Sequence, residues 1–386
     1  MDTDTNTDTA PQPRIMHFPQ DRSMGLLWYS DASAAANALR ANASDWQYFG
    51  EARGSVLVDA GMNVQLGVSP DIADDLSPLS FLRSDDLYLL NLSESGVRDS
   101  QLVYLQTLME LRSLDLAETE VSDDALGYVE ELSALQAINI SYTQIGNTGF
   151  ARLAKLLALT HLYLTATRVG DPELLHLQDF SALEVLFLTL TQVGDEGLVY
   201  LQTLHSLQEL NLDQTRVADA GLAHLQELTT LRHLNLSGTA VHGNGLAFLR
   251  GLPALQRLDL SYSKVSDVGL IGLRELTSLR QLYLDQTAIS DDGLTHLQDL
   301  TALQELDLSR TKVNGAGLAY LRRLASLETL NLSDTQVTDA DLSHLEHLNS
   351  LRSLNLSETY VSKAAVAAVQ SALPDCVIKR SLPFRN

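Results

Sequence analysis

The sequence predicts an α/β solenoid, a chain that stacks one small structural unit many times instead of folding around a single core. Leucine recurs at a constant interval of 24 residues, at twelve positions from Leu87 to Leu351. Self-similarity at such a period is typical of repeat architectures. We therefore expect twelve units over residues 87–374, with no insertion between them.

Each unit combines two hydrophobic periods. The opening L-x-x-L-x-L alternates as a short strand does, whereas the closing D-x-G-L-x-x-L-x-x-L has the spacing of an amphipathic helix. The expected unit is therefore strand, turn and helix, with the strands stacked into a parallel sheet. One complete unit is formed by Leu207, Leu210, Leu212, Thr215, Val217, Asp219, Gly221, Leu222, Leu225 and Leu228.

Two positions, counted from the first leucine of each unit, are polar in all or most units. Position nine is Thr in ten units and Ser at Ser95 and Ser263. A hydroxyl there can bond the turn backbone while the methyl fills interior space, so we expect a ladder of threonines through the stack. Position thirteen is Asp in eight units, where we expect each carboxylate to cap the helix that follows it. These residues are Asp99, Asp123, Asp171, Asp195, Asp219, Asp267, Asp291 and Asp339.

This pattern resembles the leucine-rich repeat superfamily, in particular its helix-bearing, ribonuclease-inhibitor-like branch and the Thr-rich 24-residue repeats of bacterial proteins. The resemblance covers about three quarters of the chain. It implies a horseshoe with a parallel β-sheet on the concave face and helices on the convex face. Residues 375–386, with Leu373 and Pro374 before them, look like the closing half-repeat of such proteins, and Cys376 is expected to be a small buried residue of this C-terminal cap.

The segment before the repeats divides into two parts. Residues 1–13 are rich in Thr and Asp and poor in apolar groups, so we expect a disordered tail. Residues 14–86 contain three strand-like runs, at 24–29, 56–58 and 64–68, and a degenerate helical half-unit at 72–82. We interpret this segment as an N-terminal β-rich cap, since the open end of a solenoid must be covered. An independent functional subdomain is the alternative.

Composition narrows the range of partners. The chain has 49 Asp and Glu against 26 Lys and Arg, a formal charge of −23, which disfavours nucleic acid and anionic membranes. A single cysteine excludes a disulfide framework and Cys-rich metal sites. We expect no cofactor and no metal, because the histidines that recur on one helical position would lie too far apart to share an ion. With neither a leader sequence nor a long apolar run, we expect a soluble, cytoplasmic protein.

Binding residues are expected where the strands face outward on the concave surface. At unit position five, Tyr163 and Phe187 interrupt a row that is otherwise mostly Asn and Asp. Exposed aromatic and apolar clusters on a polar surface often mark interaction sites. We predict a partner-binding site here, and the alternative is that these side chains only pack against their neighbours. The predicted site is Tyr142, His161, Tyr163, Val185, Phe187 and Leu190.

A second, acidic and aromatic patch is predicted further along the concave surface. Such a patch suits a partner that presents Lys or Arg, through charge complementarity and cation–π contact. The alternative is a solvated acidic face with no partner. Its residues are Glu209, Asp213, Arg257, Asp259, Tyr262, Tyr283, Asp285 and Asp307.

These features favour a non-enzymatic scaffold that binds a protein or peptide on the concave surface. We expect it to be a monomer. One alternative is an acidic inhibitor or decoy of a basic enzyme, which the ribonuclease-inhibitor-like resemblance permits. The other is an enzyme with its site in residues 14–86, although no recognisable catalytic triad occurs there.

Overall fold

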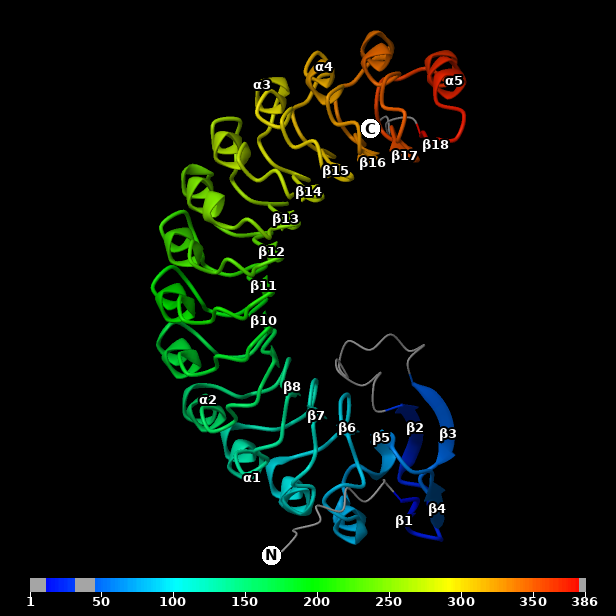
Figure 1. The fold of residues 1–386 in the computed structure, drawn as a ribbon, viewed down its shortest axis with the longest axis vertical. Helices are drawn as coiled ribbons and strands as arrows, with labels where there is room; N and C mark the ends of the chain where they lie inside the picture. Colours follow the sequence, from blue (N-terminus) through cyan, green and yellow to red (C-terminus); the bar gives the residue numbers. More distant parts are fainter. Residues whose placement is uncertain (1–11, 32–45, 382–386) are drawn as a thin grey trace, which may run out of the picture. The chain divides into compact units, whose positions relative to one another are not determined.

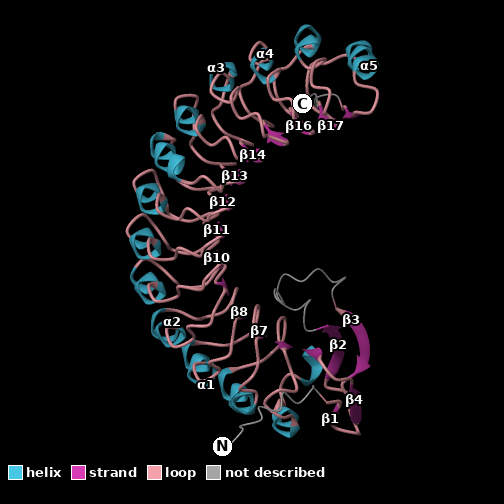
Figure 2. Ribbon diagram, viewed as in Figure 1, coloured by secondary structure: helices cyan, strands magenta, loops and turns pink. Residues whose placement is uncertain are grey.

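The structure is a computed structural model that describes residues 12–31 and 46–381. The chain forms two compact units, Met1–Tyr163 and Leu164–Asn386, and each is described here by itself. Figure 1 shows both units, and Figure 2 shows that strands and helical segments alternate along the repeats. The tail predicted at residues 1–13 lies outside the described residues except for its last two positions, as do the last five residues of the predicted C-terminal cap.

The first unit begins with a β-rich segment that leads into the repeats. Strand β2 (Gly25–Asp31) pairs antiparallel with β3 (Gln47–Glu51) on one side and with β5 (Met62–Val68) on the other. A separate antiparallel pair joins β1 (Arg14–His17) to β4 (Ser55–Val58). The three predicted strands are confirmed as β2, β4 and β5, whereas the sequence analysis missed β1 and β3.

Strand β5 connects this segment to the repeats because it also pairs in parallel with β6 (Leu89–Asn91). The repeat strands of the first unit continue with β7 (Ser113–Asp115), β8 (Ala137–Asn139) and β9 (His161–Tyr163), all parallel. Their helical segments are η2 (Pro70–Ile72), η3 (Ser77–Phe81), η4 (Asp99–Thr107), η5 (Asp123–Ala125), α1 (Leu126–Val129) and α2 (Asn147–Leu153).

The second unit repeats the same strand and helical segment eight times and then closes. Its parallel strands are β10 (Val185–Phe187), β11 (Glu209–Asn211), β12 (His233–Asn235), β13 (Arg257–Asp259), β14 (Gln281–Tyr283), β15 (Glu305–Asp307), β16 (Thr329–Asn331), β17 (Ser353–Asn355) and β18 (Val377–Lys379). The last strand, β18, pairs with β17 and follows Cys376, which is buried as predicted.

The helical segments of the second unit are short. They are η6 (Pro172–Leu177), η7 (Gly197–Leu201), η8 (Gly221–Leu225), η9 (Asn244–Gly251), η10 (Gly269–Leu273), α3 (Asp291–Leu294), α4 (Leu318–Leu321), η11 (Asp339–His344) and α5 (Lys363–Ala372). Most of the predicted helices are therefore 3₁₀ segments or single α turns. A 3₁₀ helix rises about 2.0 Å per residue against about 1.5 Å for an α-helix, so it crosses the unit in fewer residues.

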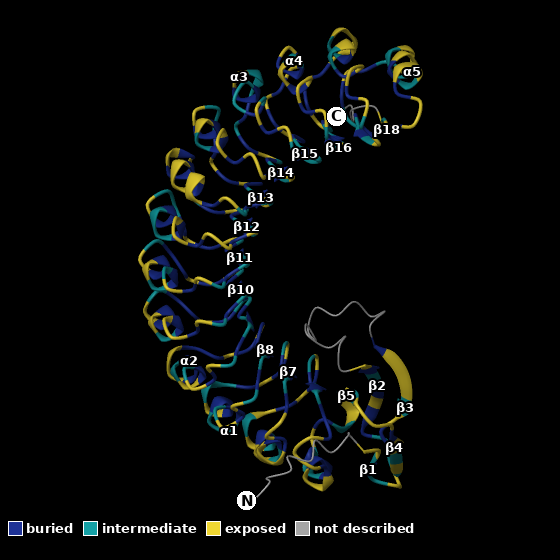
Figure 3. Ribbon diagram, viewed as in Figure 1, coloured by how far each residue is buried: buried dark blue, intermediate teal, exposed yellow. Residues whose placement is uncertain are grey.

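The core of each unit is the stack of repeat leucines. Leu210, Leu212, Leu222 and Leu225 are completely buried, and the equivalent positions of the other repeats are buried too, except for Val366 in the last repeat. Figure 3 shows this buried layer along the strands and the inner sides of the helical segments. Burial of one such side chain contributes about 1.5–3 kcal/mol, so the repeated pattern supplies the main favourable free energy of the fold.

The aspartates at position thirteen do not cap their own helices, so that prediction is wrong. In all eight repeats the Oδ1 atom accepts a backbone N–H of the next repeat, 23 or 24 residues further along, at 2.6–3.2 Å. The carboxylates therefore join neighbouring repeats. At α5 a hydroxyl does cap the helix, because the Ser362 side chain accepts the N–H of Ala365 at 3.1 Å.

The hydroxyls at position nine bond the turn backbone, as the sequence analysis expected. In all twelve repeats the hydroxyl donates to the carbonyl of position six in its own repeat, at 2.5–2.7 Å, as Thr119 does to Leu116. The row is a series of local turn bonds and not a ladder between repeats. Since these residues are buried, each bond satisfies a carbonyl that water cannot reach.

Candidate binding surface on the strand side

The strand side of each repeat carries the side chains that are free to vary. We call it the strand face and define it as unit positions three, five, seven and eight. Positions four and six point into the core, so alternation along the strand turns positions three and five outward. Position eight follows the strand and has a left-handed backbone in every repeat, with φ between 52° and 58° in eleven non-glycine residues and 63° in Gly238.

Position five has a role in the turn that the sequence analysis did not foresee. In all nine repeats with Asn or Asp there, its Oδ1 accepts the N–H of position seven at 2.8–3.1 Å. This is an Asx turn, which explains the residue preference. The row is therefore engaged within its own repeats and offers fewer hydrogen bonds to a partner than expected. The side chains of Tyr163, Phe187 and Tyr283 contain no carbonyl or carboxylate oxygen and therefore cannot make this bond.

The first unit contains three residues of the first predicted site. Tyr142 is 53% exposed at a left-handed position, and Tyr163 is partly exposed. His161 is only 5% exposed, and its Nδ1 lies 2.8 Å from the Thr160 hydroxyl. The expected exposure of His161 is therefore wrong, because position three is buried in every repeat of the first unit. Its ring lies 6.5 Å from that of Tyr163 and supports it from the side.

The second unit contains the other three residues of that site. Leu190 is exposed at a left-handed position, and Phe187 is partly exposed. Val185 is buried, so its expected exposure is also wrong. In each unit, one aromatic residue at position five and one residue at position eight remain available at the surface.

The acidic and aromatic patch lies entirely in the second unit, and the structure divides it into two groups. The larger group lies on β13, β14 and β15. The Arg257 guanidinium is 4.8 Å from the centre of the Tyr283 ring, a cation–π contact. Burial raises the pKa of the Tyr283 hydroxyl, and its hydrogen bond with Glu305 raises it further. The phenol is therefore a hydrogen-bond donor throughout the physiological range.

Arg310 completes this group, although the sequence analysis did not include it. Its guanidinium Nη1 lies 3.3 Å from the Tyr262 hydroxyl and 3.7 Å from the Asp285 carboxylate. The Ser309 hydroxyl bridges Asp285 at 2.9 Å and Asp307 at 2.5 Å. The sequence analysis could have found Arg310 from its place in the repeat. Tyr262 and Arg310 both occupy position eight, two repeats apart, and therefore lie on the same side of the strands.

The smaller group lies on β11 and β12 and in the turn after β11. A Glu209 carboxylate oxygen lies 3.4 Å from the His233 Nδ1. Burial raises the pKa of Asp213, and the negative charge of Asp259 contributes in the same direction. Electrostatic repulsion between Asp213 and Asp259 thus extends from this group to the larger one.

The described residues contain neither a group of three or more His, Cys, Asp and Glu arranged to hold a metal nor a helix long and apolar enough to cross a membrane. The surface presents charged, aromatic and hydroxyl groups on a regular backbone. Such an arrangement can form ion pairs, ring stacking and hydrogen bonds.

Comparison with known proteins identifies the repeat. Two family models, both described as leucine-rich repeat, match residues 229–289 and 323–345. No curated protein sequence is similar enough to count as a relative.

Solved structures share the fold. An internalin (inlF) from Listeria monocytogenes has 19% sequence identity and a TM-score of 0.62, with 82% of this chain and 93% of that chain covered. A leucine-rich-repeat protein from Leptospira interrogans has 18% identity and a TM-score of 0.53, with 81% and 88% covered. Together with the repeat geometry, these matches show that the chain has the leucine-rich-repeat fold.

Proposed function

We propose that the protein is a non-enzymatic scaffold that binds a protein or peptide on its strand face, with its main contact on β13 to β15. The observation that carries this proposal is the departure from the framework in these repeats. Tyr283 replaces the Asn or Asp whose oxygen stabilises the turn in nine other repeats, and Tyr262 places an exposed ring at the left-handed position that every repeat shares. The turn bond lost at Tyr283 costs stability, and such local costs are often found at functional positions.

The charge of this surface indicates the chemistry of the partner. The five repeats over 207–326 place six carboxylates and two arginines on the strand face. The carboxylates belong to Glu209, Asp213, Asp259, Asp285, Glu305 and Asp307, and the arginines are Arg257 and Arg310. The negative excess favours a partner segment that carries Lys or Arg, and the exposed Tyr262 ring offers it a cation–π contact.

We include the first predicted site in this proposal as two further contact surfaces, one in each unit. Tyr142 and Tyr163 would serve the first unit, and Phe187 and Leu190 the second. His161 and Val185, which are buried, would shape the surface without touching the partner. We propose that the protein acts as a monomer, since binding on the strand face needs no second copy.

Selection of peptides from a random library on the immobilised full-length chain tests this proposal. We expect selected peptides to be rich in Lys or Arg, and the double variant Tyr262→Ala, Tyr283→Ala to bind them at least tenfold more weakly. Tyr320→Ala is the matched control, because Tyr320 is 41% exposed on the helical segment α4. Selection of acidic peptides, or equal binding by the double variant, would exclude this surface.

The inhibitor alternative draws on the same six carboxylates. A decoy of a basic enzyme should bind mainly through charge, so its affinity would fall steeply with salt. Replacing Asp259 and Asp285 by Asn would then weaken binding more than the two tyrosine substitutions do. Asp179→Asn, an exposed change on the helical side, is the charge-matched control.

A further inference from the structure

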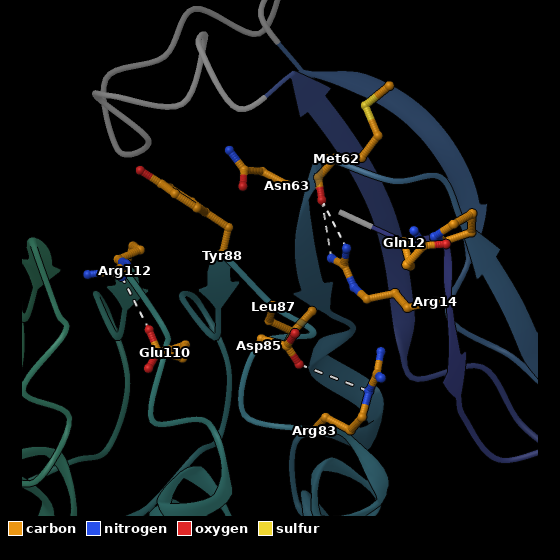
Figure 4. A pocket seen from close by; sticks show the side chains of 12 residues that line it. Gln12, Arg14, Met62, Asn63, Arg83, Asp85, Leu87, Tyr88, Glu110 and Arg112 are labelled. Atoms are coloured by element: carbon orange, nitrogen blue, oxygen red, sulfur yellow. Dashed lines mark hydrogen bonds and ion pairs between the residues drawn. The ribbon is translucent and has the colours of Figure 1, made fainter. Parts of the chain in front are cut away.

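A cavity of about 680 Å³ opens in the first unit, where the start of β5 meets the first two repeats. Figure 4 shows its lining, which includes Arg14, Met62, Arg83, Leu87, Tyr88 and Arg112. The volume lies within the range of about 300–1,000 Å³ that is typical of small-molecule sites. It is separate from the surface on β13 to β15, and it borders the segment for which an independent function was the alternative prediction.

The lining concentrates positive charge in an acidic part of the chain. Residues 12–31 and 46–112 contain six arginines, no lysine and twelve acidic residues. Three of the six arginines line this cavity, but only two of the twelve acids, Asp85 and Glu110, do so. The cavity is therefore less acidic than the rest of this region, although the Asp86 carboxylate also pairs with two of its three arginines.

One wall of the cavity carries a fixed positive charge. The buried carboxylate of Asp86 lies 3.5 Å from the Arg14 Nε and 3.1 Å from the Arg83 Nη2. The Arg14 guanidinium also donates to the Met62 and Asp86 carbonyls at 3.1–3.2 Å, which holds it in place. Two guanidinium groups thus share one buried carboxylate, and one positive charge is left over.

That surplus charge is balanced only weakly by the remaining acid on this wall. The Asp85 carboxylate lies 4.0 Å from the Arg83 Nε, and its side chain is 63% exposed. Exposed ion pairs at this distance contribute about 0–1 kcal/mol. The Nε and Nη2 atoms of Arg83 already donate to Asp86, so a ligand anion that takes the place of Asp85 would use the remaining N–H groups of the guanidinium. Guanidinium groups bind carboxylate and phosphate well because they offer several N–H donors in a planar fork.

The opposite wall offers a second, similar exchange. Arg112 donates to the Ala134 carbonyl and to Glu110, each at 3.2 Å, and the Glu110 side chain is 55% exposed. Leu87 and Tyr88 lie between Arg83 and Arg112 in Figure 4. The cavity thus has an apolar and aromatic floor between two guanidinium groups.

We propose that this cavity binds a small organic anion. Its carboxylate or phosphate group would displace Asp85 from Arg83, its apolar part would lie against Leu87 and Tyr88, and Arg112 would hold a second negative group where the ligand has one. The proposal does not depend on the strand face or its partner.

Calorimetry with the full-length chain tests the proposal with four probes: phenyl phosphate, 3-phenylpropionate, inorganic phosphate and benzyl alcohol. We expect at least one of the two aromatic anions to bind at least tenfold more tightly than benzyl alcohol and than inorganic phosphate. Their relative affinity distinguishes a phosphate ligand from a carboxylate ligand. Equal binding of benzyl alcohol, or no binding of either aromatic anion at millimolar concentration, would overturn the proposal.

Two variants and a control locate the binding site. Arg83→Gln should weaken binding of the tighter anion at least tenfold. Asp85→Asn should tighten it two- to fivefold, because the competing carboxylate is removed, and a folding defect would not produce such a gain. Arg98→Gln is the control, since Arg98 is an exposed arginine that pairs with Glu120 outside the cavity. Unchanged or weaker binding by Asp85→Asn would contradict the proposed exchange on Arg83.

Discussion

The carboxylate of Asp267 accepts both the backbone N–H of Ser290 at 2.7 Å and its hydroxyl at 2.6 Å, from the next repeat along the chain. This pair is one of eight such links, which together provide a polar connection between neighbouring repeats on the side of the turns. Solenoid stability depends on interfaces between nearest neighbours, so these links act at the place where a repeat array is held together.

Asp267→Ala should lower the free energy of unfolding by about 2 kcal/mol, because it removes two hydrogen bonds to a charged acceptor and leaves the Ser290 N–H without that carboxylate as its acceptor. Asp267→Asn keeps one acceptor oxygen and should lose less. Urea unfolding followed by circular dichroism measures both. Asp179→Ala, at an exposed position on the helical side, is the control and should change stability by less than about 0.5 kcal/mol. An equal loss in both alanine variants would contradict this role of the link.

The same kind of link predicts a loss of stability in acid. Burial raises the pKa of Asp123, but the N–H of Gly146, the hydroxyl of Thr148 and further backbone donors lower it more, so the net pKa lies below its ordinary value. A carboxylate with a depressed folded-state pKa stabilises the fold fully above its unfolded pKa of about 4, and this contribution is lost as the pH falls through the folded pKa. The stability deficit of Asp123→Asn should therefore be largest near pH 7 and shrink below about pH 4. A deficit that stays constant down to pH 2 would show that charge has no part in it.

Asp115 should show the opposite dependence on pH. Burial raises its pKa above the ordinary value, despite the opposing hydrogen bonds from Ala117 and Asn139. The folded state then disfavours the ionised form, and this cost is present at neutral pH and disappears as the pH falls through the raised pKa. Asp115→Asn introduces the residue found at this position in six other repeats. It should raise the urea midpoint at pH 7 and have little effect in acid, and a lower midpoint at pH 7 would refute this account.

The left-handed backbone at position eight predicts two substitutions with opposite effects on stability. Glu118 is an exposed residue with φ of 56°, a conformation that costs a side chain with a Cβ about 1–2 kcal/mol. Glu118→Gly removes that cost but loses more entropy on folding, so we expect a net gain of up to about 1 kcal/mol. Gly238→Ala, at the same position with φ of 63°, should lose about 1 kcal/mol. Thermal unfolding of the two variants measures both, and changes of equal sign would contradict the backbone explanation.

The repeat, its strands and its core were predictable because each depends on short-range periodicity. Leu210 and Leu212 alternate with outward residues, and Leu222 and Leu225 follow at helical spacing, so every unit carries its own signal. The β-rich segment was only partly predictable. Strand β3 (Gln47–Glu51) has four of its five residues exposed and none buried, so the alternation of buried and exposed residues that marks many strands is absent.

The sites were less predictable, because they depend on contacts between repeats. His161 and Val185 occupy outward positions in the pattern, yet their neighbours cover them. Arg310 reaches Tyr262 across 48 residues of sequence, and Arg14 reaches the carbonyl of Asp86 across 72. The 24-residue period relates Tyr262 to Arg310, but no pattern in the sequence relates Arg14 to Asp86.

By itself, the sequence determined that this protein is a stack of leucine-rich repeats with a leucine core, because a strict 24-residue period permits each hydrophobic face to be buried only against the next unit. Only the tertiary structure decided which polar group bonds which. An aspartate at position thirteen adjoins its own helix in sequence, whereas the turn of the next repeat is 23 or 24 residues away. Stacking places the N–H of the next repeat within 2.6–3.2 Å of that carboxylate, and this proximity gives the polar residues their roles.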